Sequence, residues 1–226
     1  MEQKEVRALL EQVSSGELDI DEAMLKLKEA PFEDLGFAKP DYHRALRQGI
    51  GEVIYGAGKT PEQIHDIVAS MVQQGQKSIL ITRMSSEAAE AVEQDFLIKY
   101  DKYSRIGLVG EIPEPDGIGK VVVAAAGTSD LPVAEEAAQT AECFGNEVIR
   151  LYDVGVAGLH RLLAHREEIM TARVIVAVAG MEGALVSVIG GLADCPVIAV
   201  PTSVGYGASF GGVSALLAML NSCASG

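Results

Sequence analysis

The three cysteines of the chain are its candidate nucleophiles, and the sequence gives them different settings. Cys223 stands in the small, polar stretch NSCASG after the apolar segment 213–220, whereas Cys143 ends a predicted helix and Cys195 precedes a proline. We expect Cys143 and Cys195 to be buried like small hydrophobic residues and Cys223 to be exposed. A thiolate is a strong nucleophile, so Cys223 is the candidate for covalent catalysis, with an inert surface thiol as the alternative.

A second set of candidates follows four predicted strands. Ligands of open parallel sheets bind outside the carboxyl ends of the strands. The segments at these ends are 127–130 (GTSD), 153–155 (DVG), 180–183 (GMEG) and 201–205 (PTSVG). Two of them open predicted helices, where N–H groups and small hydroxyl residues can hold an anion. Ordinary helix capping is the alternative for each turn.

Candidate substrate-binding residues come mainly from these turns. The glycine-dense run 205–212 predicts a non-helical loop that lies close to a ligand, with a flexible solvent loop as the alternative. Arg44 and Arg47, beside His43, suit either an anion site or a solvated basic face. The residues that we predict to contact substrate are Gly127, Thr128, Ser129, Gly180, Met181, Gly183, Arg83, Ser203 and Gly205.

Several other site types do not fit the sequence. The odd number and wide spacing of the cysteines predict no disulfide framework, as in proteins of a reducing compartment. The four histidines lack zinc-binding spacing, and we expect His65 to be structural, so the sequence identifies no metal ligands. The segment 58–60 (GKT) is similar to the end of a P-loop, but the leading glycine of that motif would fall at Val53, which excludes it.

The elements that must position these residues alternate regularly in the second half. Apolar strands that alternate with helices indicate a parallel, doubly wound sheet, so the fold class is α/β. We predict strands over 121–126, 147–151, 174–179 and 196–200, with helices ending near 144 and covering 158–170 and 183–189.

The first half is expected to be a helical and small α/β region. Residues 2–28 predict two short amphipathic helices around the turn 14–16. We then predict strands over 52–55 and 78–82, a helix over 61–74 with a capping box, and a helix over 85–99. The Pro- and Gly-rich stretch 110–119 predicts a linker, which divides the chain into domains 1–118 and 119–226.

Amino-acid composition and net charge indicate which classes of partner the protein can bind. The 226 residues are 48% hydrophobic, with 5% aromatics and no Trp, as in sheets whose core is Val, Ile, Leu and Ala. The net charge of −14 argues against nucleic acid, because such binding needs many Lys and Arg. The sequence has no uninterrupted apolar stretch long enough for a membrane span, and its N-terminus has no signal-like core. We expect a cytoplasmic protein with a small-molecule partner.

The second half resembles the PurE-like aminoimidazole ribonucleotide carboxylase domain. Residues 127–130 are similar to its G-S-x-S-D phosphate turn, and residues 179–185 (AGMEGAL) to its A-G-x-A-A-H-L stretch. The catalytic histidine of the purine enzyme would fall at Ala184, and residues 152–158 (YDVGVAG) replace its S-A-H-R-T-P turn. These departures argue against purine carboxylation.

The departures, together with residues 41–60 (DYHRALRQGIGEVIYGAGKT) and the terminal NSCASG, closely resemble the LarB family. These enzymes are pyridinium-3,5-biscarboxylic acid mononucleotide synthases, which begin nickel-pincer nucleotide synthesis. The resemblance implies carboxylation of the pyridinium ring of nicotinic acid adenine dinucleotide and hydrolysis of its phosphoanhydride, which releases AMP. It also implies that Cys223 is the reactive cysteine and that Glu182 is the family's glutamate.

This chemistry gives the candidate residues roles. A thiolate that adds to the electron-poor ring makes an enamine-like dihydropyridine, which can attack carbon dioxide. Glu182 or Asp130 could then accept the ring proton, and the sequence does not rank them. We expect Mg²⁺ to assist at the phosphoanhydride, with carbon dioxide or bicarbonate as co-substrate.

The resemblance also bears on assembly and length. PurE-like domains imply a homo-oligomer, here an octamer. The family continues with a further strand and helix, so we expect this sequence to be truncated at its C-terminus and to turn over more slowly than a version with that tail. The alternatives in function are a non-catalytic nucleotide-binding module and a purine ribonucleotide carboxylase or mutase.

Overall fold

The computed structural model describes residues 3–28, 32–42, 44 and 48–224. Two compact units make up the chain: the first comprises residues 1–100 and 107–111, and the second comprises residues 101–106 and 112–226. His43 and Arg47 lie outside the described residues. None of the helices within the described ranges has the length and apolar character needed to cross a bilayer.

The first unit begins with the two predicted helices, α1 (Gln3–Ser15) and α2 (Ile20–Lys28). Its sheet has the strand order β1-β2-β4-β3, in which β1 and β2 are parallel and β2 and β4 antiparallel. The strands are β1 (Val53–Tyr55), β2 (Ser78–Thr82), β3 (Ile98–Asp101) and β4 (Ile106–Gly110), and the helices are α4 (Pro61–Gln73) and α5 (Ser86–Glu93).

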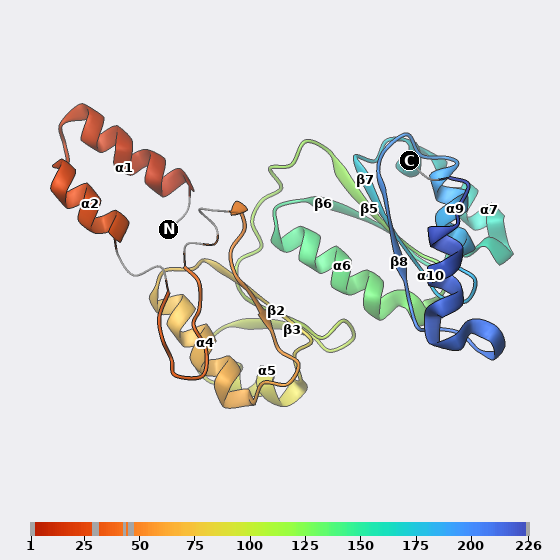
Figure 1. Ribbon diagram of the computed structural model, residues 1–226, viewed down its shortest axis with the longest axis horizontal. Helices are drawn as coiled ribbons and strands as arrows, with labels where there is room; N and C mark the ends of the chain where they lie inside the picture. The colour runs from red at the N-terminus through yellow and green to blue at the C-terminus, as the bar shows by residue number, and fades with distance from the viewer. Residues whose placement is uncertain (1–2, 29–31, 43, 45–47, 225–226) are drawn as a thin grey trace. The chain divides into compact units, whose positions relative to one another are not determined.

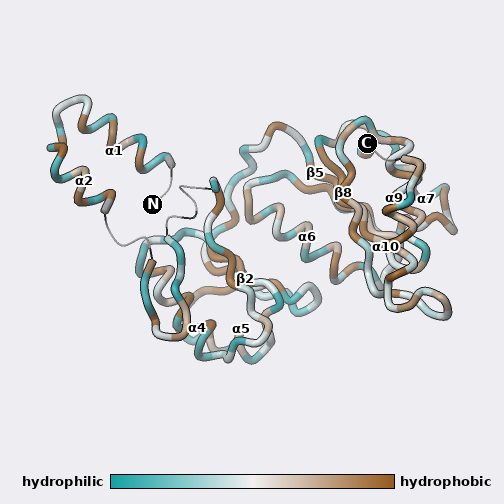
Figure 2. The backbone as a smooth tube through the Cα atoms, in the orientation of Figure 1, coloured by the Kyte–Doolittle hydropathy of each residue, from teal (hydrophilic) through white to brown (hydrophobic). Residues whose placement is uncertain are grey.

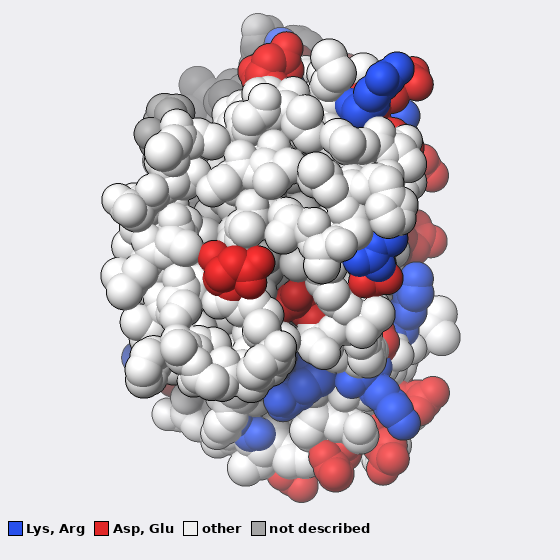
Figure 3. Space-filling model, turned by 90° about the vertical axis from the view of Figure 1, so that its right-hand side faces the viewer, with Lys and Arg blue, Asp and Glu red and all other residues white. Residues whose placement is uncertain are grey.

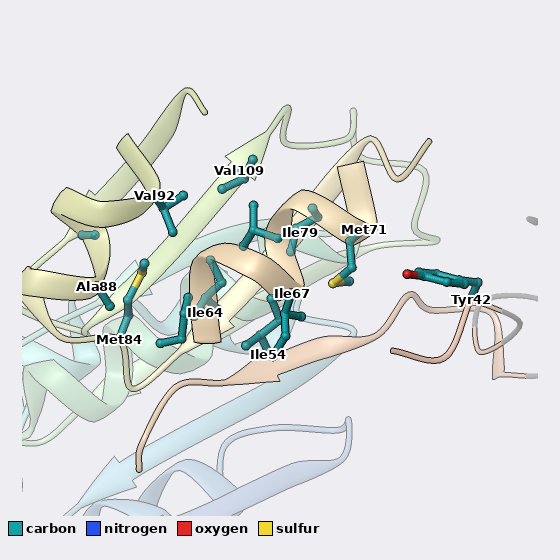
Figure 4. Close-up of a cluster of buried hydrophobic side chains, with 13 residues drawn as sticks. Tyr42, Ile54, Ile64, Ile67, Met71, Ile79, Met84, Ala88, Val92 and Val109 are labelled. Carbon is teal, nitrogen blue, oxygen red and sulfur yellow. The ribbon is translucent and has the colours of Figure 1, made fainter. Parts of the chain in front are cut away.

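Local signals explain where α4 begins. The hydroxyl of Thr60 accepts a hydrogen bond from the Gln63 N–H at 3.2 Å, and the Gln63 side chain accepts one from the Thr60 N–H at 3.0 Å. This reciprocal pair confirms the predicted capping box. Ile64, Ile67 and Met71 of α4 then pack into the core of the unit (Figure 4).

The predicted helix over 85–99 is wrong beyond Glu93. The chain turns after α5 and forms β3, whose Ile98 and Tyr100 pack against the core together with Phe96. Alternate residues therefore face the core from 96 to 100, which is the period of a strand. Pairing between β3 and β4 completes this sheet.

The second unit contains the predicted parallel sheet. Its strands are β5 (Lys120–Ala125), β6 (Glu147–Leu151), β7 (Val174–Ala179) and β8 (Val197–Pro201), in the order β6-β5-β7-β8. Every neighbouring pair is parallel, and the strands are strongly hydrophobic (Figure 2). The α/β fold class is confirmed.

Helices cover both faces of this sheet (Figure 1). Val123 and Ala125 of β5 pack with α6 (Leu131–Cys143), whereas Val122 and Ala124 belong to the core cluster on the opposite face. That second cluster includes residues of α7 (Leu159–Leu163), α8 (Arg166–Met170) and α9 (Ala184–Gly190). Alternating side chains along one strand thus build two helix layers.

Two predicted details differ from the structure. The helix expected over 158–170 is broken into a 3-10 turn (Val156–Gly158), α7 and α8. The run 205–212 was predicted not to be helical, but Gly207–Gly212 forms 3-10 turns. Left-handed backbone at Phe210, with a φ of 46°, and at Gly211 interrupts these turns, which explains why no α-helix forms there.

The helix α10 (Val213–Leu220) and the edge strand β8 leave apolar side chains exposed. Ile198 of β8 is 52% exposed. Much of the face seen in Figure 3 carries no charged side chain. The exposed large apolar residues of α10 are Val213, Leu216, Leu217 and Leu220.

Candidate active site at the carboxyl ends of the parallel strands

The segments that follow the four parallel strands lie side by side. The Ala126 N–H donates to the Val178 carbonyl at 3.0 Å, and the Val154 N–H donates to the Ala125 carbonyl at 3.1 Å. The Met181 N–H donates to the Val204 carbonyl at 2.8 Å. The turns after β5, β6, β7 and β8 therefore form one continuous edge, as expected for parallel strands.

Asp130 joins two of these turns across 72 residues of sequence. One of its carboxylate oxygens accepts the Thr202 hydroxyl at 2.7 Å, and the other accepts the Gly127 N–H at 3.1 Å. Asp130 is 3% exposed and Thr202 5% exposed. The Thr202 hydroxyl also accepts the Val204 N–H at 3.3 Å. Both oxygens of this carboxylate are therefore engaged in holding the edge together.

Asp130→Ala is expected to lower the free energy of unfolding by about 2–3 kcal/mol, because it leaves a partly buried N–H and a buried hydroxyl without their acceptor. Urea unfolding followed by circular dichroism measures this change. The control Asp194→Ala removes an exposed carboxylate and should change stability by less than about 0.5 kcal/mol. Equal stability of the two variants would contradict a structural role for Asp130.

Two of the predicted glycines are required by backbone packing. A Cβ on Gly180 would lie 2.3 Å from the Val204 carbonyl oxygen, and a Cβ on Gly155 would lie 2.6 Å from that of Ala126. Such distances are impossible for a real side chain. Gly180 was predicted to contact substrate, and the close approach seen here is of one turn to its neighbour.

Glu182 has a different environment from Asp130. It is exposed and lies between two residues in left-handed conformation, Met181 with a φ of 52° and Gly183 with a φ of 67°. Neither an ion pair nor a hydrogen bond of its side chain is recorded among the described residues. Of the two carboxylates proposed from the sequence, Glu182 is therefore the one available to a ligand.

Cys223 is exposed, as predicted, and its two chain neighbours contact α9. The neighbouring Ser222 hydroxyl lies 2.9 Å from that of Ser187, and a Cβ on Gly190 would lie 3.0 Å from Ala224. These contacts place Cys223 beside the last part of α9, whereas the turn 180–183 precedes its first residue.

The other two cysteines are not fully buried, which corrects our expectation. Cys143 and Cys195 are both partly exposed. Cys195 packs against the core cluster that includes α9. Burial, and then the charge of Asp194, raise the pKa of the Cys195 thiol, so this residue is disfavoured as a thiolate.

The remaining sequence candidates come from both units. Thr128, Ser129, Ser203 and Gly205 are exposed at the strand ends of the second unit. Arg83 follows β2 in the first unit, where its backbone is left-handed with a φ of 54°. The Arg44 side chain donates to Gln48 at 3.0 Å. The assignment of these residues to substrate stays a prediction.

Sequence reasoning missed Tyr103, whose hydroxyl donates to the Thr128 carbonyl at 3.2 Å. The loop 101–106 that carries it is fixed to α6, because the Gln139 amide donates to the Asp101 carboxylate at 2.9 Å. Burial opposes ionisation of Asp101, but hydrogen bonds led by the Ser104 hydroxyl outweigh it and lower its pKa. Because this loop belongs to a hairpin that the sequence pattern concealed, no motif could have identified Tyr103.

Neighbouring polar side chains fasten α6 to β6. Arg150 forms ion pairs with Glu135 and Glu142, and the Tyr152 hydroxyl donates to Glu135 at 2.8 Å. Burial and the Glu135 carboxylate raise the pKa of Tyr152, so the tyrosine stays protonated and donating. This network supports the turn that begins at Asp153.

The described part of the chain contains no group of three or more His, Cys, Asp or Glu side chains placed to hold a metal ion. Mg²⁺ is commonly held by one or two carboxylates together with the phosphates of a substrate. The exposed Glu182 carboxylate fits that arrangement, whereas Asp130 is occupied by its own hydrogen bonds. Any magnesium here would therefore depend on the substrate for most of its ligands.

Comparison with known proteins matches both halves of the chain. Residues 32–111 match the family model of the LarB/PurE-like N-terminal domain, and residues 120–225 match that of AIR carboxylase. The uncharacterized protein MJ0165 of Methanocaldococcus jannaschii is 38% identical over 232 residues, which cover 99% of this chain and 90% of that protein.

Proposed function

Because this chain belongs to the LarB family of carboxylase-type enzymes, we propose that it carboxylates the pyridinium ring of nicotinic acid adenine dinucleotide. Hydrolysis of the phosphoanhydride would then release AMP and pyridinium-3,5-biscarboxylic acid mononucleotide. The observation that carries the proposal is the pairing of the two family domains in one chain. An exposed cysteine and an exposed glutamate supply the groups that the chemistry needs.

Cys223 is the nucleophile of the proposed reaction. Its thiolate forms a carbon–sulfur bond to the ring, and the electron pair displaced onto the ring makes a neighbouring carbon nucleophilic. That carbon bonds to carbon dioxide, a base removes its proton, and the thiolate leaves as the ring regains aromaticity. No net oxidation occurs.

Glu182 is the better base for that proton. Its carboxylate is exposed, whereas both oxygens of Asp130 accept hydrogen bonds within the protein. We therefore assign proton transfer to Glu182 and the shape of the edge to Asp130.

Magnesium is proposed as the cofactor of the hydrolytic step. When bound to the phosphoanhydride, it would neutralise charge on the leaving phosphate. Carbon dioxide or bicarbonate is the proposed co-substrate. Free cysteines and a small-molecule substrate support the proposal of a cytoplasmic enzyme.

The position of Cys223 supports a homo-oligomer, for which we propose an octamer. Within one chain the thiol and the turn that carries Glu182 adjoin different ends of α9, so we propose that a second copy supplies the thiol. The largely uncharged face that includes α10 favours contact between copies in a chain of net charge −14, because charged faces of identical sign would repel.

Mixing two inactive variants tests this arrangement. Cys223→Ser keeps the glutamate and Glu182→Gln keeps the thiol, so refolding an equal mixture should restore about a quarter of the wild-type activity if each site uses two chains. Carboxylation is measured before and after mixing, with each variant refolded alone as the control. Absence of any recovery would place the thiol and the glutamate of each site in the same chain.

The direct test of function is product analysis by mass spectrometry. The protein is incubated with nicotinic acid adenine dinucleotide, Mg²⁺ and ¹³C-labelled bicarbonate, and we expect AMP together with a labelled dicarboxylated mononucleotide. Binding without turnover would favour the alternative of a non-catalytic nucleotide-binding module. Turnover of a purine ribonucleotide would favour the other alternative, but Ala184 occupies the first position of α9, where the resemblance places the purine enzyme's histidine.

A further inference from the structure

The charged residues of the strand-end segments are acidic and would repel an anionic substrate. Segments 127–130, 153–158, 180–183 and 202–212 contain three carboxylates and neither lysine nor arginine. The chain as a whole is also strongly acidic. A phosphate that enters this edge therefore needs a cation from a neighbouring element.

Arg161 of α7 supplies a cation at this edge. Its Nη1 donates to the carboxylate of Asp153, the second residue after β6. The pair is partly exposed, with 40% of the arginine and 52% of the aspartate side chain accessible. Asp153 adopts left-handed backbone with a φ of 57°, a conformation that is unfavourable for most residues other than glycine. The carboxylate thus comes from a constrained turn.

Gly158 provides a second constraint on the guanidinium. A Cβ at Gly158 would lie 2.7 Å from Nε, 3.1 Å from Nη2 and 3.2 Å from Cζ of Arg161. The φ of Gly158 is −128°, which any residue can adopt. A Cβ at this position would therefore displace the guanidinium from its present place beside Gly158.

The turn that holds Arg161 lies directly against the segment that leads to Gly127. The Val154 N–H donates to the Ala125 carbonyl at 3.1 Å, and Gly155 packs on the Ala126 carbonyl. Thr128 and Ser129, in the turn that follows, both have exposed side chains. A planar, five-donor guanidinium thus stands at the same edge as two hydroxyl groups, an arrangement suited to the several oxygens of a phosphate.

We propose that Arg161, oriented by Asp153 and Gly158, binds a phosphate of the substrate. The identity of the nucleotide rests on the proposed function, which this proposal deepens. The affinity of Arg161 for phosphate rests on the geometry alone. An arginine ion pair that is partly exposed can exchange one anionic partner for another or share its donors between two.

The test compares binding of three probes by calorimetry at fixed ionic strength. Nicotinic acid mononucleotide carries a phosphate and a carboxylate, nicotinamide mononucleotide carries the phosphate alone, and nicotinic acid riboside carries the carboxylate alone. Arg161→Gln should weaken binding of both mononucleotides about tenfold or more and leave the riboside unchanged. Arg166→Gln, which removes an exposed arginine at the start of α8, is the control with the same change of charge and should bind all three like wild type.

Gly158→Ala tests the positioning without changing the charge. Displacement of the guanidinium should weaken mononucleotide binding in the same direction, whereas Gly191→Ala, where a Cβ would meet its neighbours at an ordinary 3.6 Å, should not. Circular dichroism checks that each variant is folded. Wild-type affinity of folded Arg161→Gln for both mononucleotides would overturn the proposal, and a loss confined to the riboside would mean that Arg161 binds the carboxylate instead.

AMP and inorganic phosphate separate this proposal from the proposed function. Wild type should bind AMP or phosphate, and Arg161→Gln should bind them about tenfold more weakly. This result would support the anion site even if no nicotinic acid compound binds or reacts. If nicotinic acid adenine dinucleotide is carboxylated equally well by wild type and Arg161→Gln, with equal KM, the function stands and the role of Arg161 is disproved.

Discussion

Cys223→Ser is expected to lose more than 99% of carboxylation activity, a drop of about a hundredfold or more, while it still binds nicotinic acid adenine dinucleotide. An alcohol is nearly isosteric with a thiol, but at neutral pH it is a far poorer nucleophile. Rates are measured by release of labelled product, and binding by calorimetry.

The matched controls are the two other cysteines. Cys143→Ala and Cys195→Ala should retain the chemistry and lose at most some stability, because both side chains are partly exposed and the cavities left behind are small. Intact-protein mass spectrometry with the dinucleotide should detect an adduct on Cys223 alone. Retained turnover in Cys223→Ser, or an adduct mapped to Cys143 or Cys195, would refute the mechanism and leave the fold.

Glu182→Gln should reduce the carboxylation rate by about a hundredfold or more, with little change in stability or in dinucleotide affinity measured without Mg²⁺. The amide keeps the size of the side chain but cannot accept the ring proton. Because Glu182 is exposed, its replacement leaves no buried group unpaired. Single-turnover kinetics and urea unfolding measure the two properties.

The comparison with Asp130 separates a base from a structural carboxylate. Asp130→Ala should lose stability first and activity as a consequence, whereas Glu182→Gln should lose activity at unchanged stability. Exposed Glu167 offers a further control, since Glu167→Gln should alter neither property. Wild-type rates in Glu182→Gln would contradict the role of Glu182 as the base and would leave Asp130 or solvent as the proton acceptor.

The sequence by itself determined the parallel sheet of the second half and the place of its candidate site. Continuous apolar stretches such as 121–125 and 174–179 can be satisfied by strands buried on both faces, and glycine or proline marks their ends. The beginning of α4 was equally predictable, because Thr60 and Gln63 lie three residues apart. Signals of this kind act within a few residues, so one sequence carries them.

Tertiary structure alone decided which of these residues meet. The hydrogen bond between Thr202 and Asp130 joins residues that are 72 positions apart in the sequence. The position of the Arg161 guanidinium beside Gly158 depends on how α7 follows its 3-10 turn. The strand β3 was mistaken for helix because its partner β4 is not part of the local pattern. Cys223 ends beside the last part of α9 because α10 packs along that helix before the chain reaches the cysteine. Strand register and helix packing set the distances between these residues. Neither can be predicted from the spacing of residues that are close in sequence.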